Sequence, residues 1–98
     1  MLLTANDVNT FLNGIMSHAR AGNFDHVSME SALLLKKMEA AIRNSQASPE
    51  IRRAVPSVRE LLFDSGRSDA RSLLEHVRQA KNALGIEPGV TPSWSGAE

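Results

Sequence analysis

The sequence contains no cysteine, so a disulfide and a thiolate metal site are both excluded. The absence of cysteine is compatible with the cytoplasm, where disulfides are rare. Aromatic residues are also scarce, because tyrosine is absent and only Phe11, Phe24, Phe63 and Trp94 carry aromatic rings. A core built from this sequence must therefore consist mainly of leucine, isoleucine, valine, methionine and alanine, as is common where helices pack on helices.

Long hydrophobic runs and a surplus of charge are missing too. No run approaches the roughly 20 residues that span a bilayer, and the opening Met1-Leu2-Leu3 is too short for a signal peptide. We therefore expect a cytoplasmic protein without membrane association. The 11 basic residues balance the 11 acidic ones. Because non-specific binding to nucleic acid or anionic membranes needs surplus Lys and Arg, the balance argues against nucleic acid as a partner.

Hydrophobic residues recur with helical spacing along most of the chain. The pattern predicts four amphipathic helices, which begin near Thr4, Asp25, Pro49 and Asp69 and end near Gly22, Asn44, Asp64 and Gly85. Short turns between helices favour antiparallel neighbours. The sequence therefore predicts an all-α fold, an antiparallel up-down-up-down four-helix bundle over residues 1–86. Residues 87–98, rich in Pro, Gly and Ser, are predicted to be a flexible C-terminal tail.

Several helix ends carry recognisable capping signals. Thr4 is suited to cap the first helix, with Asp7 in the first turn at the positive end of the helix dipole. Gly22 stands where a left-handed C-terminal cap is expected. Gly85 followed by Ile86 predicts a Schellman motif at the end of the fourth helix.

The third helix contains a proline. Pro56 lies on the polar side of a hydrophobic pattern that otherwise continues from Pro49 to Asp64. A proline at this position removes one backbone hydrogen bond and disfavours helical geometry at Val55. We therefore expect the third helix to be kinked or broken near Val55-Pro56, with its apolar side kept in phase.

The fourth helix has a hydrophobic stripe that Lys81 interrupts. The alkyl stem of such a lysine can lie along the surface while its ammonium reaches water. Arg71 and Glu75 are spaced to pair on one side of the helix. His76 is expected on the outer surface. The stripe consists of Ala70, Leu73, Leu74, Val77 and Leu84.

The second helix has hydrophobic residues on two sides. Its core stripe consists of Val27, Leu34, Leu35, Met38, Ala41 and Ile42. Nearly opposite lies a thinner row formed by Met29, Leu33 and Ala40. A helix with two apolar sides is either central in its own bundle or covered by another chain. A chain of 98 residues has few layers in which to bury one helix twice.

These features predict a small non-enzymatic protein–protein interaction module that self-associates, with a dimer favoured. An adaptor, a chaperone, an inhibitor and an assembly subunit are all compatible with this prediction. Phe63 lies off the stripe of the third helix, and Trp94 belongs to a residue type enriched among binding anchors. Simpler interpretations of these residues stay open. Single hydrophobic residues on a protein surface are normal, and Trp94 can instead cover the helices of its own chain. The predicted interface residues are Met29, Leu33, Ala40, Phe63 and Trp94.

Catalytic and metal-binding patterns are weak or missing. The chain has no Gly-x-Ser-x-Gly turn and no glycine-rich phosphate loop, so we expect neither an enzyme nor a cofactor. His18, His26 and Glu30 should come together around the first turn, and two imidazoles with a carboxylate can bind zinc. The simpler interpretation is a group of solvated polar side chains, and we expect no metal.

One DNA-binding arrangement is the alternative function. Residues 58–84 can form a helix-turn-helix-like unit, with Arg71, Ser72 and Glu75 leading the recognition helix. However, Arg67 and Ser72, at positions that usually anchor such a helix, are polar. The chain also lacks the basic surplus that is typical of DNA-binding proteins.

Overall fold

The computed structural model describes residues 3–67 and 69–86 of the chain. These residues form four α-helices and one short 3-10 helix, with no β-strand among them. In chain order the elements are α1 (Ala5–Ala21), α2 (Phe24–Arg43), α3 (Pro49–Asp64), the 3-10 helix η1 (Ser65–Arg67) and α4 (Ala70–Ala83). The predicted all-α class is therefore confirmed.

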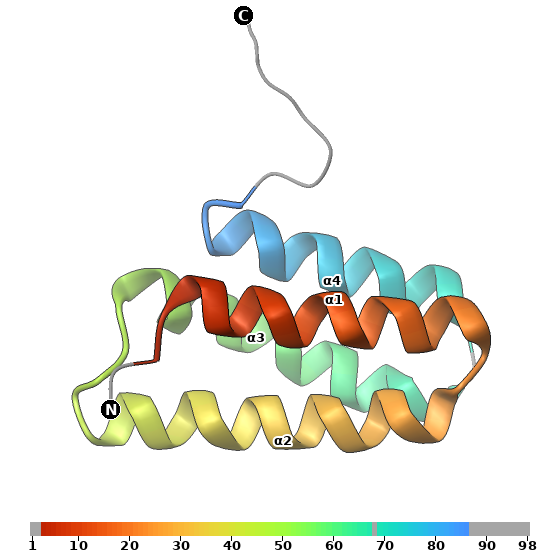
Figure 1. Ribbon diagram of the computed structural model, residues 1–98, viewed down its shortest axis with the longest axis horizontal. Helices are drawn as coiled ribbons and strands as arrows, with labels where there is room; N and C mark the ends of the chain where they lie inside the picture. The colour runs from red at the N-terminus through yellow and green to blue at the C-terminus, as the bar shows by residue number, and fades with distance from the viewer. Residues whose placement is uncertain (1–2, 68, 87–98) are drawn as a thin grey trace, which may run out of the picture.

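Helices that follow one another in the chain pack together, and the first and last helices meet as well. α1 contacts α2 and α4, while α3 contacts α2 and α4, and η1 lies against both α2 and α3. In Figure 1 the chain runs from left to right in α1 and α3 and from right to left in α2 and α4. Leu3 forms an isolated bridge with Ala47, which fixes the start of α1 beside the α2–α3 connection.

The core between the helices is aliphatic, as the scarcity of aromatic residues predicts. Within the described residues no aromatic side chain is fully buried, and Phe11 and Phe24 pack at the edge of the core. None of the described helices is long and apolar enough to cross a membrane. The largest fully buried hydrophobic side chains are Val8, Leu12, Ile15, Val27, Leu34, Met38, Ile51, Val58, Leu61, Leu73 and Val77.

Three predicted capping motifs are confirmed. The backbone N–H of Asp7 donates to Thr4 Oγ1 at 3.2 Å, and the N–H of Thr4 donates to Asp7 Oδ2 at 3.0 Å. The hydrogen bond from the Thr4 backbone holds the pKa of Asp7 below its usual range. Gly22 has φ +79°, the left-handed conformation expected after α1. Gly85 has φ +81°, and the N–H of Ile86 donates to the carbonyl of Lys81 at 2.8 Å, which completes the Schellman motif.

The N-cap of α2 lies two residues before Asp25, the residue near which the sequence predicts the helix to begin. Asn23, not Asp25, occupies the N-cap, and the helix begins at Phe24. The reason is that the connection between α1 and α2 is short and both helices hydrogen-bond to the same residue. The N–H of Asn23 donates to the carbonyl of His18 at 2.9 Å, and its own carbonyl accepts from Val27 at 3.1 Å. Asn23 therefore closes α1 and opens α2 at once.

The structure has one helix over Pro49–Asp64, with Pro56 inside it. A break near Val55-Pro56, one of the two predicted alternatives, is therefore not present, and the kink stays a prediction. Val55, whose helical geometry the proline disfavours, is only 6% exposed, whereas Pro56 itself is exposed. Burial of the hydrophobic side of α3 thus outweighs the local preference of the residue before proline.

Replacement of Pro56 with alanine is expected to stabilise the fold by about 1 to 3 kcal/mol. Alanine restores an N–H that can donate to the carbonyl of Arg52 and removes the clash between that carbonyl and the proline ring. The greater freedom of the unfolded chain offsets roughly 0.4–1 kcal/mol of this gain. Urea unfolding measures the difference, with Ser57→Ala as the control for helix propensity alone. A gain no larger than that of the control would show that α3 accommodates Pro56 without strain.

Candidate functional site: the exposed hydrophobic residues and the polar clusters around them

Three large hydrophobic side chains are exposed in the described part of the chain: Met29 and Leu33 on α2, and Phe63 on α3. Their exposed fractions are 67%, 48% and 75%. All three belong to the interface predicted from the sequence. On α2 the exposure follows from the helical period, because Val27 and Leu34 direct the opposite side of the helix into the core. We call Met29, Leu33 and Phe63 the exposed hydrophobic group.

A pair of serines joins the helices that carry this group. Ser28 Oγ donates to Ser65 Oγ at 2.7 Å, and Ser65 Oγ donates to the carbonyl of Leu62 at 2.6 Å. Met29 follows Ser28 in the chain, and Phe63 precedes Ser65 by two residues. The start of α2 and the end of α3 therefore lie together, at the right of Figure 1.

Charges of both signs surround Phe63. The guanidinium carbon of Arg67 lies 5.5 Å from the centre of the Phe63 ring, a cation–π distance. The same guanidinium lies 3.5 Å from Asp64 Oδ1. One turn earlier on α3, Arg59 donates to Glu39 of α2 at 3.1 Å. A surface with mixed charges around apolar residues suits a partner that also carries both signs.

The other two predicted interface residues are placed differently. Ala40 is partly buried and lines a hollow of about 510 Å³ between α1 and α2, together with Leu3, Phe11 and Ala41. It lies on the same side of α2 as Leu33, seven residues further along the helix. Trp94 and the whole predicted tail, residues 87–98, lie outside the described residues.

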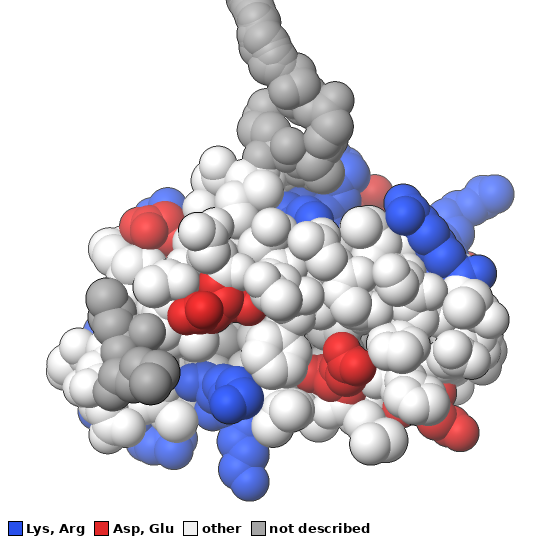
Figure 2. Space-filling model, viewed as in Figure 1, with Lys and Arg blue, Asp and Glu red and all other residues white. Residues whose placement is uncertain are grey.

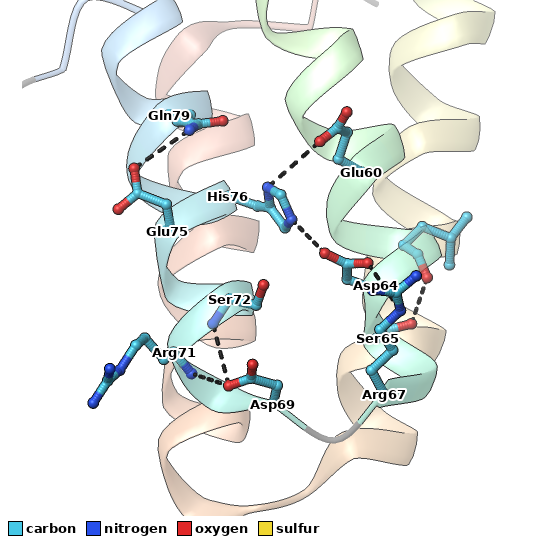
Figure 3. A network of polar contacts seen from close by, with 11 residues as sticks. Glu60, Asp64, Ser65, Arg67, Asp69, Arg71, Ser72, Glu75, His76 and Gln79 are labelled. Atoms are coloured by element: carbon cyan, nitrogen blue, oxygen red, sulfur yellow. Dashed lines mark hydrogen bonds and ion pairs between the residues drawn. The ribbon is translucent and has the colours of Figure 1, made fainter.

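His76 is a feature that the sequence pattern misplaced. Its Nε2 lies 2.7 Å from Asp64 Oδ2, and the two side chains are only 13% and 15% exposed. The expectation of an outward-facing histidine is wrong, because this side of α4 faces α3. Figure 3 shows the ring between Asp64 and Glu60, with its Nδ1 lying 3.9 Å from Glu60 Oε1.

The pair between His76 and Asp64 ties α3 to α4. The hydrogen bond from His76 holds the pKa of Asp64 below its usual range, and the charge of Arg67 acts in the same direction. For nucleophilic catalysis, the second ring nitrogen of His76, Nδ1, would have to accept a hydrogen bond from a hydroxyl, thiol or amine. In the described residues, Nδ1 of His76 is buried and has no hydrogen-bond partner. The geometry therefore indicates a link between helices.

The two histidines at the first turn do come together. The rings of His18 and His26 stack with their centroids 4.8 Å apart, and His18 Nε2 lies 3.1 Å from Glu30 Oε2. Stacked rings turn their faces toward one another, and in this orientation their nitrogens do not point at a common ion. No group of three or more His, Cys, Asp or Glu within residues 3–67 and 69–86 is arranged to hold a metal ion.

A second hollow, also about 510 Å³, lies between α1 and α4 and contains Lys81. The structure gives Lys81 a partner on α1 that the helical pattern of α4 does not identify. Lys81 is only 7% exposed, and its ammonium donates to Asn13 Oδ1 on α1. Burial lowers the pKa of Lys81, and the nearby charge of Arg20 lowers it further. The pairing of Arg71 with Glu75 is not seen either, because Glu75 accepts from Arg78.

Comparisons of the chain with protein-family models, with curated proteins and with solved structures find no match. A function for this protein is therefore proposed from its own residues and their geometry.

Proposed function

We propose that the protein is a non-enzymatic protein–protein interaction module that self-associates through the exposed hydrophobic group. The observation that carries the proposal is the placement of Met29, Leu33 and Phe63. They are the only large hydrophobic side chains exposed in the described residues, and they lie on helices joined by Ser28 and Ser65. Covering such a surface stabilises a complex by roughly 25 cal/mol per Å² of apolar area.

A second copy of the chain is the partner that the charges favour. A formal net charge of zero removes the long-range repulsion between two copies. The rim of the group carries both Arg59 and Glu39, and both Arg67 and Asp64. In an isologous dimer residue i of one copy contacts residue j of the other, and residue j contacts residue i, so a rim with both acids and bases can complement itself. Ala40 and Trp94 remain predicted interface residues.

The proposal includes the finer description of the fold. We infer an antiparallel up-down-up-down bundle, supported by the contacts between consecutive helices and between α1 and α4 and by their alternating directions in Figure 1. In this arrangement α2 has one side in the core and one side free for a partner. A kink at Pro56 and a cytoplasmic location belong to the same proposal.

Wild-type protein is expected to be dimeric at micromolar concentration, and Leu33→Glu is expected to weaken the dimer at least about 100-fold. A glutamate at Leu33 would bury an unpaired charge in the interface. Sedimentation velocity and light scattering measure the change. Ser17→Glu, which adds the same charge on an exposed position of α1, is the control and should leave the dimer intact. Monomeric wild-type protein, with Leu33→Glu indistinguishable from it, would contradict the proposal.

The DNA-binding alternative gains no support from the arrangement of residues 58–84. Glu75, one of the residues predicted to lead a recognition helix, accepts hydrogen bonds from Arg78 and Gln79. Arg71 lines the hollow between α1 and α4. Interaction with protein is therefore the function that we carry forward.

A further inference from the structure

Lys81 is a buried cation with no carboxylate beside it. A lysine ammonium has three donors, and within the described residues only Asn13, a neutral acceptor, receives one of them. No described Asp or Glu lies within ion-pair distance of Lys81. Burial of a charge without a counter-charge is unfavourable. An apolar residue of similar length would fill this position at least as well for stability alone, so the charge needs another explanation.

The hollow next to Lys81 is lined by further cations. Arg20 reaches it from α1, and Arg71 and Arg78 reach it from α4. The side chains of Arg20 and Arg71 have no acidic partner in the described part of the chain. Among the described residues that line the hollow, Glu75 is the only acid, and it accepts a hydrogen bond from Arg78 Nε at 3.2 Å. Three cations of the hollow thus have no counter-charge among the described residues.

Apolar residues line the same hollow as the cations. On α4, Arg71, Arg78 and Lys81 fall on one side of the helix at i, i+7 and i+10. Figure 2 shows Lys and Arg atoms gathered at the upper right of the molecule, near the start of α4. The apolar part of the lining consists of Met16, Leu74 and Val77. Such a combination suits a ligand with one charged end and one apolar end.

We propose that the hollow between α1 and α4 binds a small amphipathic anion, a carboxylate or phosphomonoester attached to an apolar chain. The anionic group meets Lys81 and the arginines, whose planar guanidinium groups can bind carboxylate or phosphate through two hydrogen bonds. The apolar chain lies over Met16, Leu74 and Val77. A volume of about 510 Å³ lies within the usual range for small-molecule sites. This site is separate from the exposed hydrophobic group on α2 and α3.

A titration of ¹⁵N-labelled full-length protein with decanoate and with decyl phosphate, below their micellar concentrations, tests the proposal. Both anions are expected to shift the amide signals of Met16, Leu74 and Lys81 and to bind at least about tenfold more tightly than decanol or inorganic phosphate. Comparison of the two anions shows whether a carboxylate or a phosphate is preferred. Equal binding of decanol would mean that the charges do not recognise the ligand, and shifts confined to other surfaces would overturn the proposal.

Two variants separate a binding lysine from a structural one. Lys81→Met is expected to weaken decanoate binding at least about tenfold while raising Tm by about 5 °C, because an apolar side chain replaces an unpaired buried charge. Arg71→Gln, at an exposed position, is expected to weaken binding about threefold or more without changing Tm. Lys36→Gln removes the same charge from an exposed position outside the hollow and is the control.

Other outcomes would overturn the assignment. A lower Tm for Lys81→Met together with unchanged anion binding would show that Lys81 serves the fold alone. If Lys81→Met does not fold, binding that is unchanged in Arg71→Gln would overturn the proposal by itself. Binding of duplex DNA that falls steeply with salt and is lost in Arg71→Gln would assign this surface to nucleic acid.

Discussion

Replacement of Leu34 with alanine is expected to lower the free energy of unfolding by about 3 kcal/mol, whereas the same change at Leu33 lowers it by less than about 1 kcal/mol. The two leucines are neighbours on α2, but Leu34 is 0% exposed and Leu33 is 48% exposed. Truncation of Leu34 removes buried methyl groups and leaves a cavity between close-packed helices. Truncation of Leu33 removes atoms that already touch water.

The comparison is made by urea unfolding followed by circular dichroism, with equal m-values required before the free energies are compared. For a domain of this size, a loss of about 3 kcal/mol corresponds to a fall in Tm of roughly 15 °C. If the chain self-associates, the small effect of Leu33→Ala grows with protein concentration, because the dimer stabilises the folded state by mass action. Equal effects at the two positions, independent of concentration, would contradict both the burial of Leu34 and the role of Leu33.

The difference between these leucines could be predicted from the sequence, since a helical period of 3.6 residues assigns each position a direction relative to its own helix. The same period identified most of the core on α2. It did not predict the extent of burial at the edges of the core stripe of α2, where Leu35 and Ile42 are partly buried and Ser31 is fully buried. At such boundary positions the neighbouring helix decides how much of a side chain is covered.

Capping motifs were predictable for a similar reason. The hydrogen bonds at Thr4, Asp7 and Gly85 form between residues a few positions apart, so residue type and spacing are sufficient to identify them. The start of α2 was not predictable in the same way. Asn23 hydrogen-bonds to the end of α1 and to the start of α2, so the sequence signals for the two helix ends overlap at this residue.

The partners of His76 and Lys81 were not predicted, for a different reason. His76 lies beside the hydrophobic stripe of α4 and Lys81 interrupts it, and the helical period alone does not say how far a polar side chain at either position is covered by a neighbouring helix. His76 is covered because Asp64 lies opposite it on α3, and Lys81 because Asn13 lies opposite it on α1, 68 residues away in sequence. Neither partner can be identified from the period of α4 alone. The hollow around Lys81 could be recognised only once α1 and α4 were placed side by side.

Acidification is expected to destabilise the protein, and the loss is expected to be smaller in Asp64→Asn than in the wild type. The pKa of Asp64 is lowered in the folded state, first by the hydrogen bond from His76. The unfolded chain therefore binds the proton more readily, and stability falls as the pH falls. The contribution is complete above the unfolded-state pKa, about 3.9, and is lost as the pH falls through the lower folded-state value. The lowered pKa values of Asp7 and Glu75 act in the same direction.

Urea midpoints measured between pH 6 and pH 2 separate Asp64 from the other carboxyl groups. Asp64→Asn should lie below the wild type at pH 6 and approach it at pH 2, because protonation removes from the wild type the charge that the variant already lacks. Asp25→Asn removes a carboxylate from an exposed position without touching the link between α3 and α4, and is the control for the loss of one negative charge. Combination of Asp64→Asn with His76→Ala should be non-additive at pH 6, since both changes break the same link between α3 and α4. Additive effects at pH 6, or a pH profile for Asp64→Asn parallel to that of the wild type, would show that the pair contributes nothing to holding these helices together.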